Sequence, residues 1–103
     1  MKISIALATY NGEAFLQDQL QSFEMQTRLP DEIIISDDNS TDKTLKILQN
    51  FKLETSIIVK IVNNNLGQGA VRNFNNALTH TSGDIILLSD QDDIWLPNKI
   101  EIY

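Results

Sequence analysis

The chain has 103 residues, which suits a single compact domain. It is 42% hydrophobic and 21% charged, the composition of a folded domain, and its net charge of −6 argues against a general nucleic-acid binder, which usually carries a basic stripe. The chain has no cysteine, which excludes disulfides and thiolate metal sites.

The apolar run near the N-terminus covers only residues 3–8. It is too short for the apolar region of a signal peptide, and no run approaches the roughly 18 apolar residues that suggest a membrane span. We therefore expect a soluble cytoplasmic domain.

The elements expected along the chain alternate between strand and helix. Apolar runs mark the strands, and apolar side chains three or four residues apart mark the helices. Strands are expected over residues 2–8, 32–36, 56–62 and 84–88, and the helices between them are marked by Leu16, Leu20 and Phe23, then by Leu45, Leu48 and Phe51, then by Val71, Phe74 and Leu78.

This alternation predicts βαβ units and an α/β fold, with a mostly parallel sheet between two layers of helices. Residues 1–103 would form one domain, without an internal repeat or a linker. Pro97 suits the first turn of a fourth helix, and Trp95 and Leu96 just before it are expected to pack beneath the binding edge.

A segment of short polar side chains follows each expected strand. Because the carboxyl ends of parallel strands share one edge of the sheet, these segments should converge on one ligand site. Asp, Asn and Ser are also ordinary turn formers and caps, so Asn39 or Ser40 could instead cap a helix, and residues 63–65 could be a plain loop. The segments are residues 9–11, 37–40, 63–65 and 89–93.

The last of these segments, Ser89-Asp90-Gln91-Asp92-Asp93, favours function most strongly. Three carboxylates within four positions repel one another, and a divalent cation would remove that cost. The Asp-x-Asp spacing supplies hard oxygen ligands for Mg²⁺ or Mn²⁺, with phosphates completing the shell, and the spacing of an EF-hand is absent.

Other candidates are weaker. Gly67-Gln68-Gly69 looks like half of a glycine-rich phosphate loop. Arg72 could meet a phosphate near the binding edge or could be an ordinary surface residue. His80 is expected to be a solvated residue at a helix end.

With these residues in hand, the chain resembles the N-terminal half of a family 2 glycosyltransferase of the GT-A fold, an inverting and metal-dependent class. The resemblance covers the whole chain, and residues 90–95 look most like bacterial rhamnosyltransferases of cell-surface polysaccharide synthesis. It implies the strand order 3-2-1-4. The motifs that carry it are Ala8-Thr9-Tyr10-Asn11 with Glu13, Ser36-Asp37-Asp38-Asn39-Ser40-Thr41-Asp42, Gly67-Gln68-Gly69-Ala70-Val71-Arg72-Asn73 and Asp90-Gln91-Asp92-Asp93.

The resemblance also implies a donor, an acceptor and roles for single residues. The donor would be a UDP- or dTDP-sugar, and the acceptor a glycan or a lipid-linked molecule reached at the inner face of the membrane. Asp38 would accept a hydrogen bond from the pyrimidine N3–H. The nucleoside would lie along Ala8, Thr9, Tyr10 and Glu13, Arg72 would sit near the base or phosphate, Asp90 would reach the ribose, and Asp92 with Asp90 would hold Mn²⁺ or Mg²⁺.

The family's catalytic base lies beyond the metal motif, so the resemblance places it and the acceptor half outside these 103 residues. We therefore expect the chain alone to be inactive. The strand at residues 84–88 is apolar on both faces yet would be an edge strand, so self-association through that edge is expected.

Two alternatives remain at this stage. A receiver-like phosphoacceptor domain is also a parallel α/β fold with acids at strand ends, but no lysine follows the fourth strand before Lys99. The other alternative is a non-catalytic module that binds a sugar nucleotide or a metal.

Overall fold

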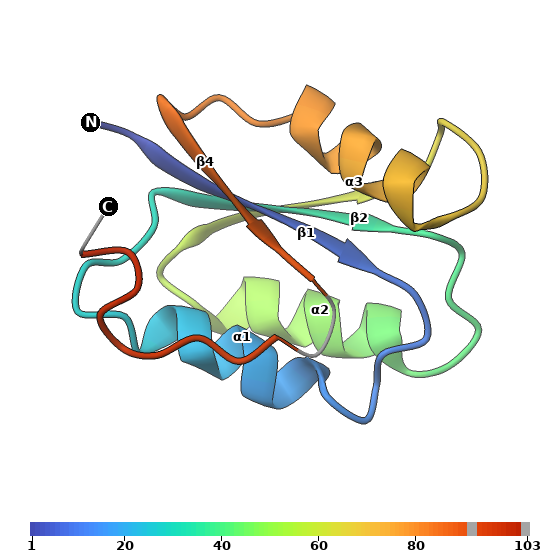
Figure 1. Cartoon of the computed structure of the whole chain (residues 1–103). Helices are drawn as coiled ribbons and strands as arrows, with labels where there is room; N and C mark the ends of the chain where they lie inside the picture. Colours follow the sequence, from blue (N-terminus) through green and yellow to red (C-terminus); the bar gives the residue numbers. More distant parts are fainter. Residues whose placement is uncertain (91–92, 102–103) are drawn as a thin grey trace.

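The computed structural model describes residues 1–90 and 93–101, in which four strands alternate with three helices (Figure 1). The elements are β1 (Ile3–Thr9), α1 (Leu16–Glu24), β2 (Glu32–Asp37), α2 (Thr44–Glu54), β3 (Ile58–Asn63), α3 (Ala70–Thr79) and β4 (Ile85–Ser89). All seven elements predicted before Pro97 are confirmed, with bounds that differ by a few residues.

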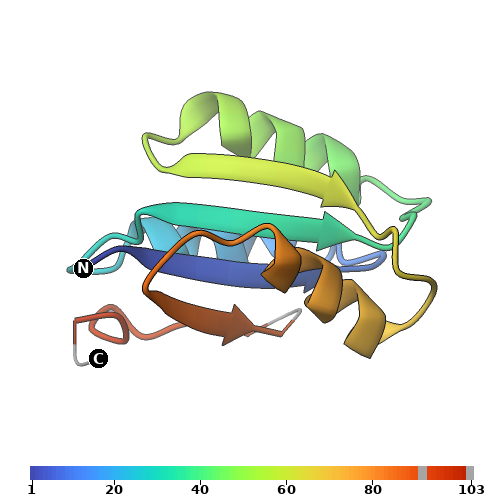
Figure 2. The same cartoon turned by 90° about the horizontal axis from the view of Figure 1, so that it is seen from above.

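The four strands form one parallel sheet in the order β3-β2-β1-β4, as the resemblance implied (Figure 2). Ile5 at the centre of β1 pairs with Ile33 of β2 on one side and with Leu87 of β4 on the other. β1 and β2 are buried along their whole length because they have a strand on each side and helices on both faces.

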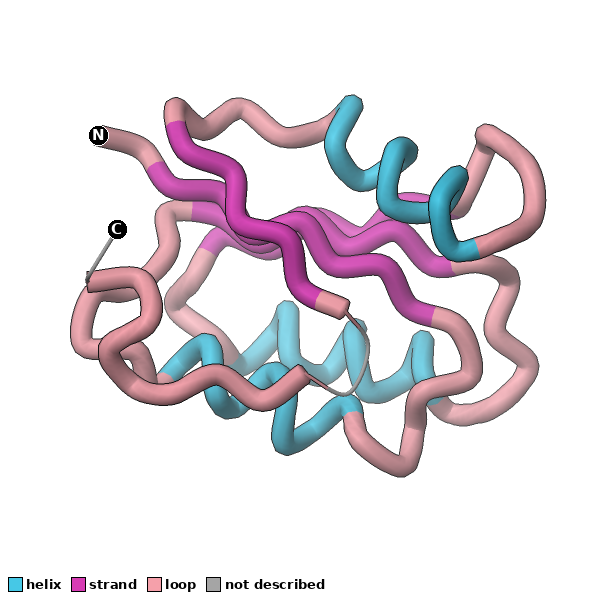
Figure 3. Tube along the Cα trace, in the orientation of Figure 1, coloured by secondary structure: helices cyan, strands magenta, loops and turns pink. Residues whose placement is uncertain are grey.

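Helices cover both faces of this sheet. α1 and α2 lie together on one face and α3 lies on the other, which gives the predicted three layers (Figures 1 and 3). The larger core forms on the side of α1 and α2, where Leu16, Phe23 and Leu48 pack against β1 and β2. Within the described residues, no helix is long and apolar enough to cross a membrane.

The core under α3 is small, and it corrects one expectation. Val71 was predicted on the inner face of this helix but is 75% exposed. Asn73 and Asn76 are buried there instead, because their side-chain amides donate to backbone carbonyls at the ends of β1 and β3. Apolar spacing alone could not reveal a helix that is held to the sheet by amides.

The chain after β4 also differs from expectation, since residues 97–101 form a turn rather than a helix. An α-helix would bond the Ile100 N–H to the Leu96 carbonyl. The Gln26 side chain takes both groups instead, accepting from Ile100 N at 3.0 Å and donating to Leu96 O at 2.7 Å. Trp95 is buried as expected, against Phe23, but the expectation for Leu96 is wrong because it is 75% exposed.

The amino-terminal ends of the strands are tied together by a polar cluster. The buried Glu32 carboxylate accepts from the Ser4 hydroxyl at 2.5 Å and from the Ser82 backbone N–H at 2.7 Å. Gly83 lies so close to β1 that a Cβ there would be 2.8 Å from the Ser4 nitrogen. Burial alone would raise the pKa of Glu32, but the hydrogen bonds from Ser4 and Ser82 outweigh it and lower that pKa.

Candidate functional site

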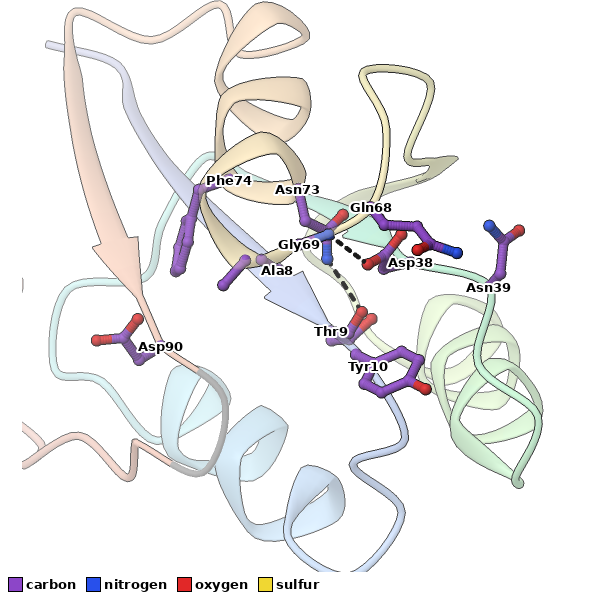
Figure 4. Close-up of a pocket in the computed structure, with 11 residues that line it drawn as sticks. Ala8, Thr9, Tyr10, Asp38, Asn39, Gln68, Gly69, Asn73, Phe74 and Asp90 are labelled. Atoms are coloured by element: carbon purple, nitrogen blue, oxygen red, sulfur yellow. Dashed lines mark hydrogen bonds between the residues drawn. The ribbon is translucent and has the colours of Figure 1, made fainter.

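A cavity of about 710 Å³ lies at the carboxyl-terminal edge of the sheet (Figure 4). It is formed where the segments after β1, β2 and β4 meet the start of α3, which is the place expected for a ligand in an open parallel sheet. Its described lining consists of Ala8, Thr9, Tyr10, Asp38, Asn39, Gln68, Gly69, Ala70, Asn73, Phe74 and Asp90.

Asp37 organises this edge from inside the protein. Its fully buried carboxylate accepts from the Thr9 hydroxyl at 2.7 Å, from Ser40 N at 2.9 Å and from the Ser40 hydroxyl at 2.7 Å. These bonds join the end of β1 to the loop after β2. Asp37 is therefore a structural residue. Of these two neighbouring carboxylates, that of Asp38 lines the cavity.

The loops after β1 and β2 are further joined through Asn11. The Asn11 side-chain oxygen accepts from Thr41 N at 2.8 Å, and the Asn11 backbone N–H donates to the Ser40 hydroxyl at 2.9 Å. Asn11 has φ of 46° and Asn39 has φ of 56°, a left-handed conformation that asparagine tolerates better than most residues. The helix cap predicted at Asn39 or Ser40 is wrong, because α2 begins only at Thr44.

The Asp42 carboxylate makes the corresponding contacts at the start of α2. It accepts from Thr44 N at 2.9 Å and from Glu13 N at 3.2 Å. Hydrogen bonds, first of all the one with the Thr44 side chain, lower the pKa of Asp42. Glu13 itself is exposed and is not among the described residues that line the cavity.

Asp38 is held in place from two sides. Its carboxylate accepts from the Gly69 N–H and from the Asn64 side-chain amide, each at 3.1 Å. Gly69 has φ of 111°, which suits glycine and turns its N–H toward the carboxylate. A carboxylate has about four acceptor positions, so Asp38 can still accept a hydrogen bond from a ligand. The loop after β3 thus reaches the cavity through Asn64, which supports Asp38.

Asp90 lies at the other end of the cavity, beyond β4 and across from Asp38 (Figure 4). Its backbone carbonyl accepts from the Gln19 side-chain amide and from Asp93 N, the latter at 3.2 Å. The Asp93 carboxylate accepts from the Trp95 indole N–H at 3.3 Å. The predicted metal ligand Asp92 lies outside the described residues.

Arg72 is placed away from the described lining of the cavity. It is exposed in the first turn of α3, and its guanidinium lies against Gly67, where a Cβ would be 2.6 Å from Nη1. The structure thus brings together Ala8, Thr9, Tyr10, Asp38 and Asp90 around one cavity, and leaves Glu13 and Arg72 outside its described lining.

Sequence reasoning missed three residues of this region. Asn73 donates to the Thr9 carbonyl at 3.1 Å, Phe74 lines the cavity, and Gln19 reaches Asp90 from α1. Asn73 belongs to one of the motifs that carry the resemblance but was given no role of its own, and for Gln19 the only signal was a polar residue among the apolar positions of its helix. That signal becomes informative only after the partner strand is known.

The described part of the site suits a metal that binds with few protein ligands. Within residues 1–90 and 93–101, no three acidic or imidazole side chains are grouped to enclose a cation. Mg²⁺ and Mn²⁺ are often bound by one or two carboxylates together with substrate phosphates. The exposed Asp90 carboxylate at the cavity fits such an open site.

Comparison with known proteins gives a consistent result. The family model described as "Glycosyl transferase family 2" matches residues 4–102. The dTDP-rhamnosyl transferase RfbG of Shigella flexneri is 41% identical over 99 residues, covering 92% of this chain and 34% of RfbG.

Two solved structures are also similar. TarS 1-349 of Staphylococcus aureus in complex with UDP superimposes with a TM-score of 0.87 at 28% identity, covering 99% of this chain and 30% of that one. The curated TarS sequence is named poly(ribitol-phosphate) beta-N-acetylglucosaminyltransferase and is 33% identical over 96 residues, covering 90% of this chain and 16% of TarS. Glucosyl-3-phosphoglycerate synthase of Mycobacterium tuberculosis, in complex with Mn²⁺, UDP and glucosyl-3-phosphoglycerate, has a TM-score of 0.72 at 26% identity, covering 87% of this chain and 33% of that one. The chain therefore spans about a third of the length of RfbG and of these two structures.

Proposed function

Because the chain belongs to glycosyl transferase family 2, we propose that its cavity binds the UDP- or dTDP-linked sugar donor of a glycosyltransferase. The observation that carries this proposal is the convergence of Ala8–Tyr10, Asp38 and Asp90 on one cavity from three separate strand ends. Family membership decides against the receiver-like alternative.

Asp38 would read the base of the donor. A carboxylate that retains acceptor positions can take the imide N3–H of uracil or thymine, a group that cytosine lacks. The backbone and side chains of Ala8, Thr9 and Tyr10 line the same cavity and would lie along the nucleoside. The UDP bound by TarS and the dTDP in the name of RfbG support a pyrimidine donor. Glu13 and Arg72 would contact the nucleotide from outside the described lining.

Asp90 would face the ribose and, together with Asp92, would hold Mn²⁺ or Mg²⁺. When bound, such an ion would act as a Lewis acid that neutralises charge on the diphosphate and so makes the nucleoside diphosphate a better leaving group. The Mn²⁺ and UDP in glucosyl-3-phosphoglycerate synthase support a metal in this family. The part that this chain's own residues play is to orient the nucleotide and to keep the Asp90 carboxylate at the cavity.

The acceptor site and the catalytic base would lie outside these 103 residues. RfbG and TarS are at least about three times as long as this chain, and the name of TarS indicates a polymeric acceptor. We propose that the native reaction is inverting transfer to a glycan or a lipid-linked acceptor. The chain alone would bind the donor without transferring the sugar, so that in isolation it behaves as a sugar-nucleotide-binding module.

The outer edge of β4 would make this chain self-associate. Ile86 is 39% exposed and Leu88 is 56% exposed on an edge strand, and within the described residues no strand pairs with the outer side of β4. Such edges pair readily with other chains. Sedimentation velocity should show dimers or larger species at micromolar concentration, and a monomer across the whole range would contradict this.

Calorimetric titration of the chain with UDP, dTDP, CDP and GDP, each with Mn²⁺ and with EDTA, tests the proposal. Metal-dependent binding of UDP or dTDP, with CDP and GDP much weaker, is expected. Equal binding of CDP would contradict base reading by Asp38, and equal binding in EDTA would contradict the metal site.

A further inference from the structure

Gln19 is a buried side chain that the function described so far does not use. It lies on the inner face of α1 and is completely inaccessible to solvent. Its amide nitrogen donates to the Ser89 hydroxyl at 3.1 Å and to the Asp90 backbone carbonyl. Gln19 therefore links α1 to Asp90, the residue that follows β4 at the cavity.

Within the part of the chain that the structure describes, the oxygen of this amide has no hydrogen-bond partner. Among the described residues, Gln19 Oε1 and Asn73 Oδ1 are the buried side-chain atoms that lack a hydrogen bond. An unpaired buried carbonyl costs stability, and a methionine of similar size would avoid that cost. The neighbouring Leu16, Leu20 and Phe23 are all core residues, so an apolar side chain would suit this helix face. Packing therefore does not explain an amide at this position, whereas its contact with Asp90 does.

We propose that Gln19 is a positioning residue for the donor site, an inference that rests on the proposed function. The Asp90 carbonyl that accepts from Gln19 also accepts from the Asp93 N–H. By holding this one carbonyl, Gln19 ties the Asp90 backbone to α1 and keeps the Asp90 carboxylate at the cavity. Gln19 itself touches neither nucleotide nor metal.

Gln26 offers a matched control in the same chain. It is also a buried glutamine that bonds to the backbone after β4, at Leu96 and Ile100. Both ends of its amide are bonded, and it is not among the residues that line the cavity. Gln26 thus provides the same kind of anchor for the chain, but away from the site.

The experiment compares Gln19→Met with Gln26→Met in the 103-residue chain. Kd for UDP and dTDP is measured by calorimetry in Mn²⁺ and in EDTA, and stability by urea unfolding. Gln19→Met should raise the Kd in Mn²⁺ at least fivefold. Gln26→Met should lower the urea midpoint at least as much while changing both Kd values less than twofold. A Gln19→Met variant with wild-type affinity in Mn²⁺ would overturn the proposal.

Hydrogen exchange at the Asp93 amide separates this inference from the proposed function. If the wild-type chain binds no nucleotide, the donor-site proposal fails for this chain, but exchange still tests Gln19. Gln19→Met should accelerate exchange at Asp93 at least tenfold, and Gln26→Met should leave it within threefold. Unchanged exchange in Gln19→Met would overturn the positioning role whether or not nucleotide binds.

Discussion

The two ends of the sheet carry similar polar side chains but arrange them in opposite ways. At the amino-terminal ends of the strands, the carboxylates of Asp31, Glu32 and Asp84 accept hydrogen bonds from backbone or side-chain groups of neighbouring segments. At the carboxyl-terminal ends, Asp38 and Asp90 border a cavity, and two buried amide oxygens beside them have no partner within the described residues. A closed polar cluster stabilises the fold, whereas an open one can bind a ligand.

This contrast gives a rule for interpreting such proteins. Acidic residues at strand ends look alike in the sequence, and the structure separates them by whether the carboxylate borders a cavity, as those of Asp38 and Asp90 do. Substitutions at the amino-terminal ends of the strands should lower stability and leave nucleotide affinity unchanged. Substitutions around Asp38 should weaken nucleotide binding and have little effect on stability.

The largest effect is expected for Gly83→Ala at the amino-terminal end. The new Cβ would lie 2.4 Å from the Ser4 hydroxyl and 2.8 Å from the Ser4 backbone nitrogen, so the start of β4 must move away from β1. We expect a loss of about 2–3 kcal/mol in the free energy of unfolding, measured with urea. The exposed neighbour Asp84 serves as control, and Asp84→Ala should cost about 1 kcal/mol or less. A loss below about 1 kcal/mol in Gly83→Ala would show that the two strands are not tightly apposed.

Glu32→Gln should destabilise the protein by about 2 kcal/mol at pH 7, since a buried carboxylate with several hydrogen bonds becomes an amide that cannot accept them all. The pKa of Glu32 is lowered in the folded state from its ordinary 4.5. Its contribution is therefore complete above about pH 4.5 and is lost as the pH falls through the folded-state pKa.

Urea unfolding between pH 7 and pH 3 checks this dependence. The variant should lose less stability on acidification than the wild type, while Glu54→Gln, which changes an exposed residue at the end of α2, should follow the wild-type curve. Parallel curves for Glu32→Gln and wild type would contradict a lowered pKa.

The sequence predicted the sheet and the place of the site because both depend on local patterns. Apolar runs and helical spacing located the seven elements, and the polar segments after β1, β2 and β4 do meet at one cavity. The roles of Gln19, Gln26 and Asn73 could not be predicted. Each side chain bonds to backbone 64 to 74 residues away, and no local pattern encodes such a pairing.

At the carboxyl-terminal end, Asp38→Ala should affect binding rather than folding. Asp38 is only half-buried and lines the cavity, so its loss would remove the acceptor that we propose for the pyrimidine N3–H. We expect the Kd for UDP or dTDP in Mn²⁺ to rise about tenfold, equivalent to about 1.4 kcal/mol. The exposed Glu54, which is not among the residues that line the cavity, provides the control, since Glu54→Ala should keep the affinity within about threefold. Equal losses for both variants would place base recognition elsewhere.

The smallest effect is expected for Asn64→Ala, which tests whether a residue of the β3 loop acts on the cavity through Asp38. The Asn64 amide donates to Asp38 Oδ1 at 3.1 Å, and its side-chain oxygen accepts from Leu66 N at the same distance. Without it, the Gly69 N–H would be the remaining donor to the Asp38 carboxylate among the described residues. The Kd should rise about threefold in wild-type background, which is about 0.6 kcal/mol, and should not rise further when Asp38 is already alanine.

The exposed Asn65, next along the same loop, controls for the loss of an asparagine, and Asn65→Ala should leave the Kd unchanged. Additive losses in the Asp38→Ala and Asn64→Ala double variant would mean that Asn64 contacts the nucleotide itself. In that case the loop after β3 would contact the nucleotide directly instead of acting through Asp38. All four strand ends would then contribute directly to the site.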